Sequence, residues 1–309
     1  MSNTLSRQTS ASTLSSGLRL RRLMDQSCVQ IPGAFSALCA LAIKQAGFDA
    51  CYVSGAATSV SAGVPDVGIL TLEHFCRVIR EVSDAGGLPV LADADTGFGE
   101  SEMVRRTVIE YARAGAAGLH IEDQVFPKRC GHLDGKKLIP IEHQCEKIAA
   151  AARAARELSG GASAEFIICA RTDARGVEGI DAAISRAQAY VKAGADMIFP
   201  EGLQTEQEFA QVADQLRPRG NGPYLLANMT EFGKTPIIPH KQFAQMGYSC
   251  VIYPVSMLRV AMGAVTRALT MLKDDGSVQR SLPDMLTREE LYKLIDYTPG
   301  EEWDYSTGQ

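Results

Sequence analysis

The sequence predicts a single (β/α)8 barrel, in which eight parallel strands are each followed by a covering helix. Eight short apolar runs recur along the 309 residues, and each leads into a longer segment whose apolar residues have helical spacing. Such alternation is typical of a parallel sheet with helices outside it. Eight repeats in one run favour a closed barrel over an open doubly wound sheet.

The predicted strands are the short apolar runs, and the predicted helices are the amphipathic segments after them. The strands are placed at Cys28–Pro32, Ala50–Ser54, Pro89–Asp95, Gly118–Asp123, Glu165–Asp173, Met197–Glu201, Tyr224–Met229 and Val251–Ser256. The helices are placed at Phe35–Ala46, Leu72–Asp84, Ser101–Ala114, Ile141–Leu158, Asp181–Ala193, Thr205–Leu216, Pro239–Met246 and Met257–Leu272. Thr71 is a predicted N-cap of the second helix.

Three of the helices are predicted to end in the same way. Gly47, Gly115 and Gly194 each follow a helix and lead straight into the next strand. Glycine at this position readily adopts the left-handed backbone conformation that terminates many helices. The recurrence indicates one structural unit used repeatedly, which supports the barrel.

Both ends of the chain depart from this repeat. Residues 1–24 contain four Arg, many Ser and no acidic residue. This composition resembles a mitochondrial transit peptide; the alternative is a flexible N-terminal segment of a cytoplasmic protein that leads into a first helix. Residues 25–273 form the predicted barrel domain, and residues 274–309 are a connector and a C-terminal helix. The apolar stripe of that helix, at Thr287–Tyr297, needs another surface, either its own barrel or a neighbouring subunit.

Composition excludes two classes of partner. The net charge is −5, and the short run Arg19-Leu20-Arg21-Arg22 is the largest basic cluster, so nucleic acid is not an expected partner. No apolar run approaches the roughly 20 residues that span a bilayer, so we expect no membrane insertion. The eight Cys residues include no CxxC pair, which indicates reduced thiols in a reducing compartment such as the cytoplasm.

Polar residues follow nearly every predicted strand. In a (β/α)8 barrel the carboxyl ends of the strands meet at one rim, where the active site forms. A single Asp at such a position often only caps the next helix. Seven polar strand ends converging on one rim favour a catalytic site; the residues include Tyr52, Ser54, Asp93, Glu122, Arg171, Glu201, Asn228 and Arg259.

An acidic cluster is predicted on this rim. Asp93 and Asp95 lie two apart on one predicted strand, so both are expected to point to the same face. Together with Glu122 and Asp66 they supply carboxylate oxygens without paired His or Cys, a composition that suits Mg²⁺, or Mn²⁺, rather than Zn²⁺. The alternative is a pair of helix-capping Asp residues.

The run Lys128-Arg129-Cys130-Gly131-His132 predicts a proton donor. Basic neighbours lower a thiol pKa, so Cys130 is a candidate acid, with a small hydrophobic side chain in a basic loop as the alternative. His132 either tunes the thiol or hydrogen-bonds the loop. Arg171 and Arg259 suit carboxylates, unless each forms a structural salt bridge. A polycarboxylate substrate whose carbanion is stabilised by a metal and protonated by Cys130 fits this set.

These motifs resemble the isocitrate lyase / phosphoenolpyruvate mutase superfamily over almost the whole chain. The supporting segments are Tyr52-Val53-Ser54-Gly55, Asp93-Ala94-Asp95-Thr96-Gly97-Phe98-Gly99, Gly118-Leu119-His120-Ile121-Glu122-Asp123-Gln124, Lys128-Arg129-Cys130-Gly131-His132, Ala170-Arg171-Thr172-Asp173-Ala174 and Asn228-Met229-Thr230-Glu231-Phe232-Gly233. The Lys-Arg-Cys-Gly-His motif is typical of the lyase branches. The Asn228–Gly233 segment and the modest length are most similar to the 2-methylisocitrate lyase branch.

The resemblance implies a helix-swapped homotetramer that binds Mg²⁺ and cleaves 2-methylisocitrate to pyruvate and succinate, a step of propionate breakdown in the methylcitrate cycle. It implies that Asp93 holds the metal directly, with Asp66, Asp95 and Glu122 partly through water. Cys130 is implied as the acid, Tyr52 as a candidate base, and Glu201 and His132 as supporting catalytic residues. Substrate binding is implied for Ser54, Gly55, Gly131, Arg171, Asn228, Thr230 and Arg259. Two alternatives are an oxaloacetate hydrolase or decarboxylase of the same superfamily, and a non-catalytic barrel that binds ligands.

Overall fold

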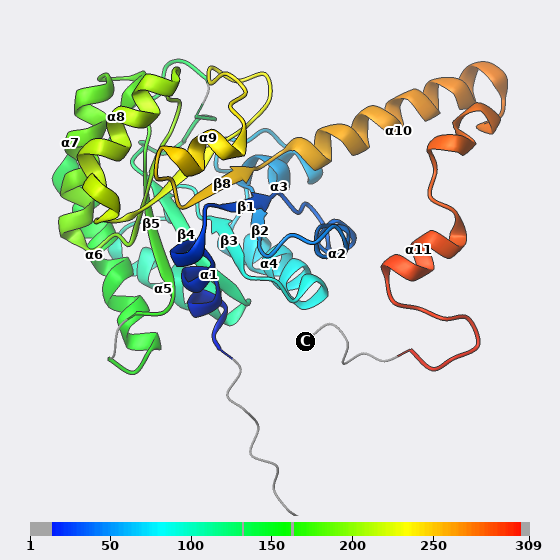
Figure 1. Cartoon of the computed structure of the whole chain (residues 1–309), viewed down its shortest axis with the longest axis horizontal. Helices are drawn as coiled ribbons and strands as arrows, with labels where there is room; N and C mark the ends of the chain where they lie inside the picture. The colour runs from blue at the N-terminus through cyan, green and yellow to red at the C-terminus, as the bar shows by residue number, and fades with distance from the viewer. Residues whose placement is uncertain (1–13, 132, 162–163, 304–309) are drawn as a thin grey trace, which may run out of the picture.

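Eight parallel strands form a closed barrel at the centre of the molecule (Figure 1). The computed structural model describes residues 14–131, 133–161 and 164–303. The strands are hydrogen-bonded in the order β1-β8-β7-β6-β5-β4-β3-β2. The two ends of this order meet at a parallel bridge between Gly33 and Tyr52, where the Ala34 N–H donates to the Tyr52 carbonyl at 2.8 Å. The predicted barrel is confirmed.

The strands and helices alternate as predicted, and every predicted strand overlaps an observed one. The strands are β1 Val29–Pro32, β2 Cys51–Val53, β3 Val90–Asp93, β4 Ala116–Glu122, β5 Ile167–Thr172, β6 Met197–Pro200, β7 Tyr224–Asn228 and β8 Cys250–Tyr253. The helices are α1 Ser16–Gln26, α2 Ala37–Gln45, α3 Gly55–Ser61, α4 Leu72–Gly86, α5 Ser101–Arg113, α6 Ile141–Leu158, α7 Ile180–Ala193, α8 Glu206–Leu216, α9 His240–Gln245, α10 Ser256–Asp275 and α11 Arg288–Leu294. Short 3-10 turns lie at η1 Ala174–Gly176, η2 Pro218–Gly220 and η3 Gln279–Asp284.

The ends of the helices follow their sequence signals in part. Gly47, Gly115 and Gly194 have φ angles of 85°, 96° and 112°, so each adopts the predicted left-handed conformation after its helix. Thr71 occupies the N-cap position of α4, but its side chain makes no capping hydrogen bond. α3 was not predicted, because the small residues from Gly55 to Ser61 carry no helical apolar stripe.

The interior of the barrel is one apolar cluster. It contains alternate strand residues, such as Val29 and Ile31 of β1, together with Leu20 and Met24 of α1. Because strand side chains alternate between two faces, the next inward residues lie at the carboxyl ends of the strands. This alternation is what brings the polar side chains of different strands to one rim.

Helix α1 covers the opposite, amino-terminal end of the barrel. Leu20 is fully buried, and the Arg21 Nε donates to the Glu165 carbonyl just before β5 at 3.0 Å. Part of the segment 1–24, predicted to be flexible, is therefore an anchored helix. Residues 1–13 lie outside the described residues, and the division into 1–24, 25–273 and 274–309 as domains stays a prediction.

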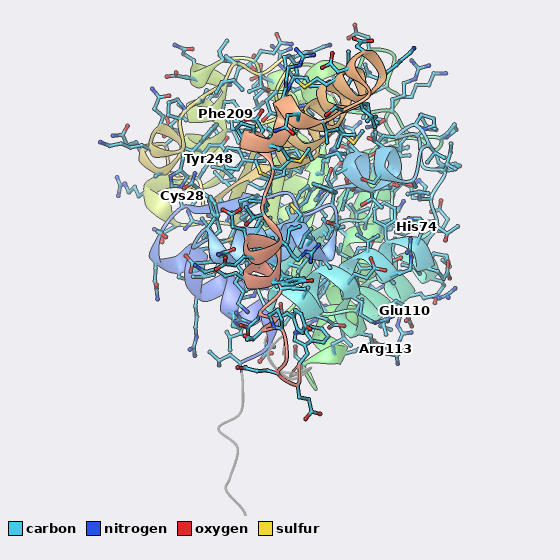
Figure 2. The ribbon with its side chains drawn as sticks, turned by 90° about the vertical axis from the view of Figure 1, so that its right-hand side faces the viewer. Cys28, His74, Glu110, Arg113, Phe209 and Tyr248 are labelled. Atoms are coloured by element: carbon cyan, nitrogen blue, oxygen red, sulfur yellow. The ribbon has the colours of Figure 1, made fainter. Side chains whose placement is uncertain are left out.

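The last barrel helix is the main departure from the predicted fold. α10 was expected to cover the barrel as its eighth helix, but it runs away from it and carries η3 and α11 with it (Figure 1). Viewed from that side, α10 and α11 lie in front of the barrel, while Glu110 and Arg113 of α5 lie at its outer edge (Figure 2). An apolar stripe predicts a helix but does not say what covers it. Among the described helices none is long and apolar enough to cross a membrane.

Along α10 the apolar side chains are exposed, and Leu258 is its one buried residue. Leu269 is 59% exposed, and Met262, Val265 and Leu272 continue the same stripe at spacings of three and four residues. The following helix α11 contacts α2 of the same chain. We call residues 256–303 the C-terminal arm.

Candidate active site

The predicted site residues meet at the carboxyl-terminal rim of the barrel, around a cavity of about 250 Å³. Its lining brings together residues from the ends of six strands and from the loops that carry Asp66 and Cys130, as expected for this fold. The predicted residues that line it are Tyr52, Ser54, Asp66, Asp93, Cys130, Gly131, Arg171, Glu201, Asn228, Thr230 and Arg259. Gly55, Asp95 and Glu122 do not line it but contact residues that do, and His132 lies outside the described residues.

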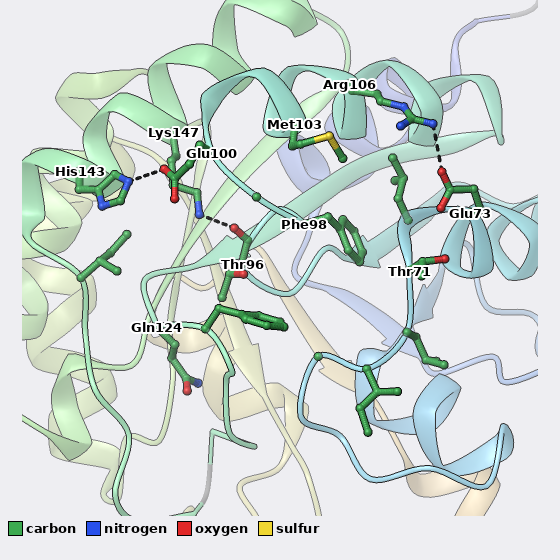
Figure 3. A pocket seen from close by; sticks show the side chains of 17 residues that line it. Thr71, Glu73, Thr96, Phe98, Glu100, Met103, Arg106, Gln124, His143 and Lys147 are labelled. Atoms are coloured by element: carbon green, nitrogen blue, oxygen red, sulfur yellow. Dashed lines mark hydrogen bonds and ion pairs between the residues drawn. The ribbon is translucent and has the colours of Figure 1, made fainter.

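A larger cavity, of about 570 Å³, opens beside the rim between α4, α5 and the start of α6. Phe98, Met103 and Lys147 are among its lining residues (Figure 3). It includes none of the predicted site residues. Its charged groups pair with each other or with the backbone: Arg106 with Glu73, and His143 with Glu100. We place the chemistry in the smaller cavity, where unlike charged groups converge.

Asp93 and Asp95 come together by a turn rather than by strand alternation. β3 ends at Asp93, and Asp95 lies beyond it with φ of 45°. The Asp95 N–H donates to Asp93 Oδ1 at 2.9 Å, and the Gly55 N–H donates to Asp93 Oδ2 at 3.1 Å. The expected shared strand face was therefore wrong, although the two carboxylates are neighbours. Gly55, predicted to bind substrate, directs its N–H at Asp93.

Lys128 supplies positive charge to the acidic cluster. Its ammonium contacts Asp66 and lies 2.8 Å from Asp95 Oδ1. Burial by itself lowers the pKa of Lys128, but the negative charges of the surrounding carboxylates outweigh burial and hold the pKa well above the usual range. Glu122 is fully buried; its Oε2 lies 3.2 Å from an Arg171 nitrogen, while its Oε1 has no hydrogen-bond partner among the described residues. Lys128 was not predicted to serve this role, because its sequence neighbours do not reveal which carboxylates it meets.

The cluster holds more negative than positive charge. Four carboxylates, of Asp66, Asp93, Asp95 and Glu122, face the cations of Lys128 and Arg171. Burial raises the pKa of Asp95 to about 6, despite Lys128, and burial raises the pKa of Glu122 well above its usual range. Because burial disfavours the charged form of both carboxylates, an added cation would stabilise them as anions, and carboxylate oxygens suit a hard divalent cation.

No three His, Cys, Asp or Glu side chains among the described residues form a ready-made metal cage. Mg²⁺ usually keeps several waters and binds through one or two carboxylates plus substrate oxygens, so it does not need such a cage. The donor set therefore fits Mg²⁺ through its chemistry and its unneutralised charge.

Tyr52 and His120 form a buried pair beneath the cluster. The Tyr52 hydroxyl lies 2.7 Å from His120 Nε2, and His120 Nδ1 lies 3.6 Å from Asp93 Oδ1. Burial lowers the pKa of His120 to about 4, so the imidazole is neutral at pH 7. Burial and the nearby Asp93 hold the pKa of Tyr52 well above its usual range. A phenolate at Tyr52 would require added positive charge.

Two arginines face the cavity with different partners. Arg171 donates to the Asp173 carboxylate from Nε at 3.0 Å and from Nη2 at 3.2 Å, and it stacks on the Phe199 ring at 5.2 Å. Arg259, at the start of α10, donates to Thr230 Oγ1 at 3.2 Å and to the Glu231 carboxylate at 2.7 Å. Asp173 and Glu231 were not among the predicted site residues.

Glu201 organises the side of the rim opposite the acidic cluster. Its carboxylate accepts from the Asn228 amide at 3.0 Å and from the Gly202 N–H at 2.7 Å, and it lies 3.7 Å from Arg171 Nη2. Asn228 is thereby held with its Oδ1 without a hydrogen-bond partner among the described residues. Glu201 therefore contacts two other residues that line the cavity, and its catalytic role stays a prediction.

The thiol loop docks directly on these residues. Cys130 is half-buried and lines the cavity, and a Cβ on Gly131 would lie 2.5 Å from both Arg171 Nη2 and Glu201 Cγ. Only glycine allows this approach. The charged groups of Lys128 and Arg129 contact Asp95 and the Asp134 carbonyl, and their expected effect on the thiol stays a prediction.

The model of the family described as phosphoenolpyruvate phosphomutase matches residues 20–273. The chain belongs to the phosphoenolpyruvate mutase / isocitrate lyase superfamily. It is 48% identical over 268 residues to a probable 2-methylisocitrate lyase 1 of Corynebacterium glutamicum, covering 87% of this chain and 85% of that protein. It is 47% identical over 287 residues to the 2-methylisocitrate lyase of Bacillus subtilis, covering 93% and 91%.

Solved structures of the superfamily share the fold. An oxaloacetate acetylhydrolase in complex with 3,3-difluorooxalacetate has a TM-score of 0.85 and 34% identity, covering 91% of this chain and 93% of that one. A phosphonopyruvate hydrolase complex with oxalate and Mg²⁺ has a TM-score of 0.79 and 28% identity, covering 92% and 95%. The predicted family is confirmed, and it includes members whose structures hold Mg²⁺ and a small carboxylate.

Proposed function

We propose that this protein is a Mg²⁺-dependent carbon–carbon lyase that cleaves 2-methylisocitrate to pyruvate and succinate. The observation that carries the proposal is one cavity of about 250 Å³ that is lined by Cys130, Arg171 and two carboxylates of the acidic cluster, Asp66 and Asp93. Relatives named 2-methylisocitrate lyase, at 42–48% identity over most of their length, support the same reaction. A non-catalytic barrel would have no need of buried, incompletely neutralised carboxylates.

Two groups of residues would bind the metal and the substrate. Asp93 would hold the cation, with Asp66, Asp95 and Glu122 around it. Arg171, Arg259, Asn228, Thr230, Ser54, Gly55 and Gly131 would bind and orient the substrate carboxylates through charged and neutral donors. Mg²⁺, when bound, would withdraw electron density from the substrate oxygens and make the hydroxyl group of the substrate more acidic.

The cleavage requires one base and one acid. Tyr52 is the candidate base for the substrate hydroxyl proton, with His120 hydrogen-bonded to it at 2.7 Å. The hydroxyl oxygen then forms the carbonyl of pyruvate as the adjacent carbon–carbon bond breaks. Its electron pair passes to the carbon that becomes a succinate methylene, and the Cys130 thiol protonates that carbon. Glu201 and His132 would support the acid.

We also propose that the protein is a homo-oligomer, with a homotetramer as the expected form, and that it resides in the cytoplasm. The exposed apolar stripe of α10 supports the assembly, because such a face is typical of a protein–protein interface. An exchange of helices between subunits would bury this stripe. The similarity of this chain to a lyase of the bacterium Bacillus subtilis supports the cytoplasmic location.

The proposal is tested with three acids: 2-methylisocitrate, isocitrate and oxaloacetate, each with and without Mg²⁺. Pyruvate and succinate should form from 2-methylisocitrate in the presence of Mg²⁺, at the highest kcat/KM of the panel. The similarity to oxaloacetate acetylhydrolase makes oxalate and acetate from oxaloacetate the main rival products. Preferred turnover of oxaloacetate would replace the proposed substrate, and no turnover of any acid would favour a binding protein.

A further inference from the structure

The loop that carries Cys130 is tied at its base. It leaves the end of β4 and returns beside it, where the Val125 N–H donates to the Lys137 carbonyl at 2.8 Å. Nearer the barrel, the Ile139 N–H donates to the Asp123 carbonyl at 2.9 Å. Backbone pairing therefore fixes where the loop begins and ends. The position of its middle depends on side-chain contacts.

One such contact holds the residue before the thiol. The Gln124 side chain accepts from the Arg129 N–H at 2.9 Å and donates to the Arg129 carbonyl at 2.9 Å. Gln124 lies just after β4, so the two hydrogen bonds of its amide attach the loop to the barrel. They fix one side of Cys130.

Lys136 holds the other side. Its ammonium donates to the Gly131 carbonyl and, at 2.8 Å, to Asp173 Oδ1. The Lys136 side chain is 4% exposed, although Lys137 next to it is exposed to solvent. A buried ammonium is stable only when it is paired and hydrogen-bonded, so these two contacts define its position.

Asp173 connects this contact to the substrate side of the cavity. Its carboxylate is fully buried and also accepts hydrogen bonds from Arg171 Nε at 3.0 Å and from Arg171 Nη2 at 3.2 Å. Lys136, Asp173 and Arg171 thus form a chain from the backbone of the thiol loop to a cavity-lining guanidinium. A shift of Gly131 moves Cys130, its direct neighbour, relative to Arg171.

We propose that Lys136 is a positioning residue that holds the Cys130 loop closed against the rim and sets the thiol relative to Arg171. The inference deepens the proposed function, because it rests on Cys130 acting there as the acid. Without the ammonium, the buried Gly131 carbonyl and Asp173 each lose a donor. The loop then opens, and a displacement of about 1 Å at a reacting group can cost on the order of 10²-fold in rate.

The test compares Lys136→Met, which keeps the length of the side chain without its charge, with the matched control Lys137→Met. Steady-state kinetics with 2-methylisocitrate and Mg²⁺ give kcat and KM. Alkylation of the protein by iodoacetamide, followed by peptide mass spectrometry, gives the reaction rate at Cys130. The buried Cys169 and Cys250 in the same digests report whether the barrel has remained folded.

Lys136→Met is expected to lower kcat by roughly 10- to 100-fold with a smaller change in KM, because the acid is displaced while the substrate contacts remain. Alkylation of Cys130 should rise at least about tenfold, the shift in an opening equilibrium expected from losing a hydrogen bond to a charged group. Removing a positive charge would by itself raise the thiol pKa and slow alkylation, so a faster reaction reports exposure. Lys137→Met should match the wild type.

The proposal is overturned if Cys130 alkylation in Lys136→Met stays within twofold of Lys137→Met, whatever happens to kcat. If Cys169 and Cys250 also become reactive, the barrel has unfolded, and Lys136→Gln, which keeps one N–H donor, is judged by the same criterion. A wild type without lyase activity, combined with faster Cys130 alkylation in Lys136→Met, would refute the proposed reaction and leave the positioning role standing.

Discussion

The rim of the barrel and the C-terminal arm differ in whether their side chains find partners within the same chain. At the rim, charged side chains meet partners from other parts of the same chain, as Arg171 meets Glu122 of β4 and Lys128 meets Asp95. Along α10, the apolar side chains of Met262, Val265 and Leu269 are exposed. The rim is arranged within one chain, whereas the stripe of the arm requires a second surface. Catalysis and assembly should therefore respond to different mutations.

The largest expected effect is at the thiol. Cys130→Ser should fold normally and lose about 10²–10⁴-fold in kcat, because a serine hydroxyl holds its proton too tightly to act as the acid. Pyruvate release and the elution volume in size-exclusion chromatography are measured together.

The matched control is Cys145→Ser, a partly buried Cys on α6 outside the cavity. It should leave turnover close to that of the wild type. Activity of Cys130→Ser within a few-fold of the wild type would rule out the thiol as the acid.

Metal removal is expected to cost roughly 10³-fold in turnover, since electrostatic stabilisation by a metal is worth several kcal/mol. EDTA should abolish activity and added Mg²⁺ should restore it. Asp93→Asn should resemble the chelated enzyme and recover little with Mg²⁺.

Asp181→Asn, an exposed carboxylate in the first turn of α7, is the control and should respond to Mg²⁺ as the wild type does. Calorimetric titration with Mg²⁺ measures binding separately from catalysis. Full activity in metal-free buffer would contradict the proposed dependence of turnover on Mg²⁺.

A mutation in the C-terminal arm is expected to change the oligomeric mass clearly and the catalytic rate less. Leu269→Asp places a charge in the apolar stripe of α10 and should give smaller species in analytical ultracentrifugation. Arg267→Asp, on the opposite face of the same helix, should keep the mass of the wild type.

If Leu269→Asp and Arg267→Asp have the same mass as the wild type, the stripe is not an interface. If Leu269→Asp loses assembly and its remaining subunits still cleave substrate, the separation between rim and arm is confirmed. Loss of all activity on dissociation would mean instead that the rim depends on a neighbouring subunit.

The smallest expected effect is at the start of α11. Thr287 and Glu290 form a capping box, in which the Glu290 N–H donates to Thr287 Oγ1 at 3.2 Å and the Thr287 N–H donates to Glu290 at 2.7 Å. Thr287→Ala should destabilise this helix by about 1 kcal/mol without changing kcat. Hydrogen exchange of the α11 amides measures the loss, and unchanged protection would show that the arm is held by other contacts.

Local periodicity predicted the barrel well. The eight strands and the glycine-terminated helices depend on residues close in sequence, and each was placed near its observed position. α10 shows the limit, because its amphipathic pattern was identified but its covering surface was misassigned. Which surface covers a helix is decided by distant parts of the chain or by another chain.

The candidate site shows the same division between local and distant signals. Their positions at predicted strand ends placed Arg171, Glu201 and Asn228 on one rim, because the carboxyl ends of barrel strands meet there. Strand alternation was used to place Asp93 and Asp95 on one face. The alternation argument failed at Asp95, which lies in a turn after β3. Lys128 was identified only as a basic neighbour of Cys130, and Lys136 was not identified at all, since Lys136 and Lys137 look alike until the fold shows which one meets a buried carboxylate.

The measurement that tests the account most directly is a time course of 2-methylisocitrate followed by NMR, with Mg²⁺, for the wild type and Cys130→Ser at equal concentration. The wild type should release pyruvate and succinate in equal amounts as the substrate disappears, while Cys130→Ser should leave it nearly intact over the same period. Persistence of the substrate with the wild type, or equal product release by both proteins, would contradict a Cys130-dependent lyase at the rim of this barrel.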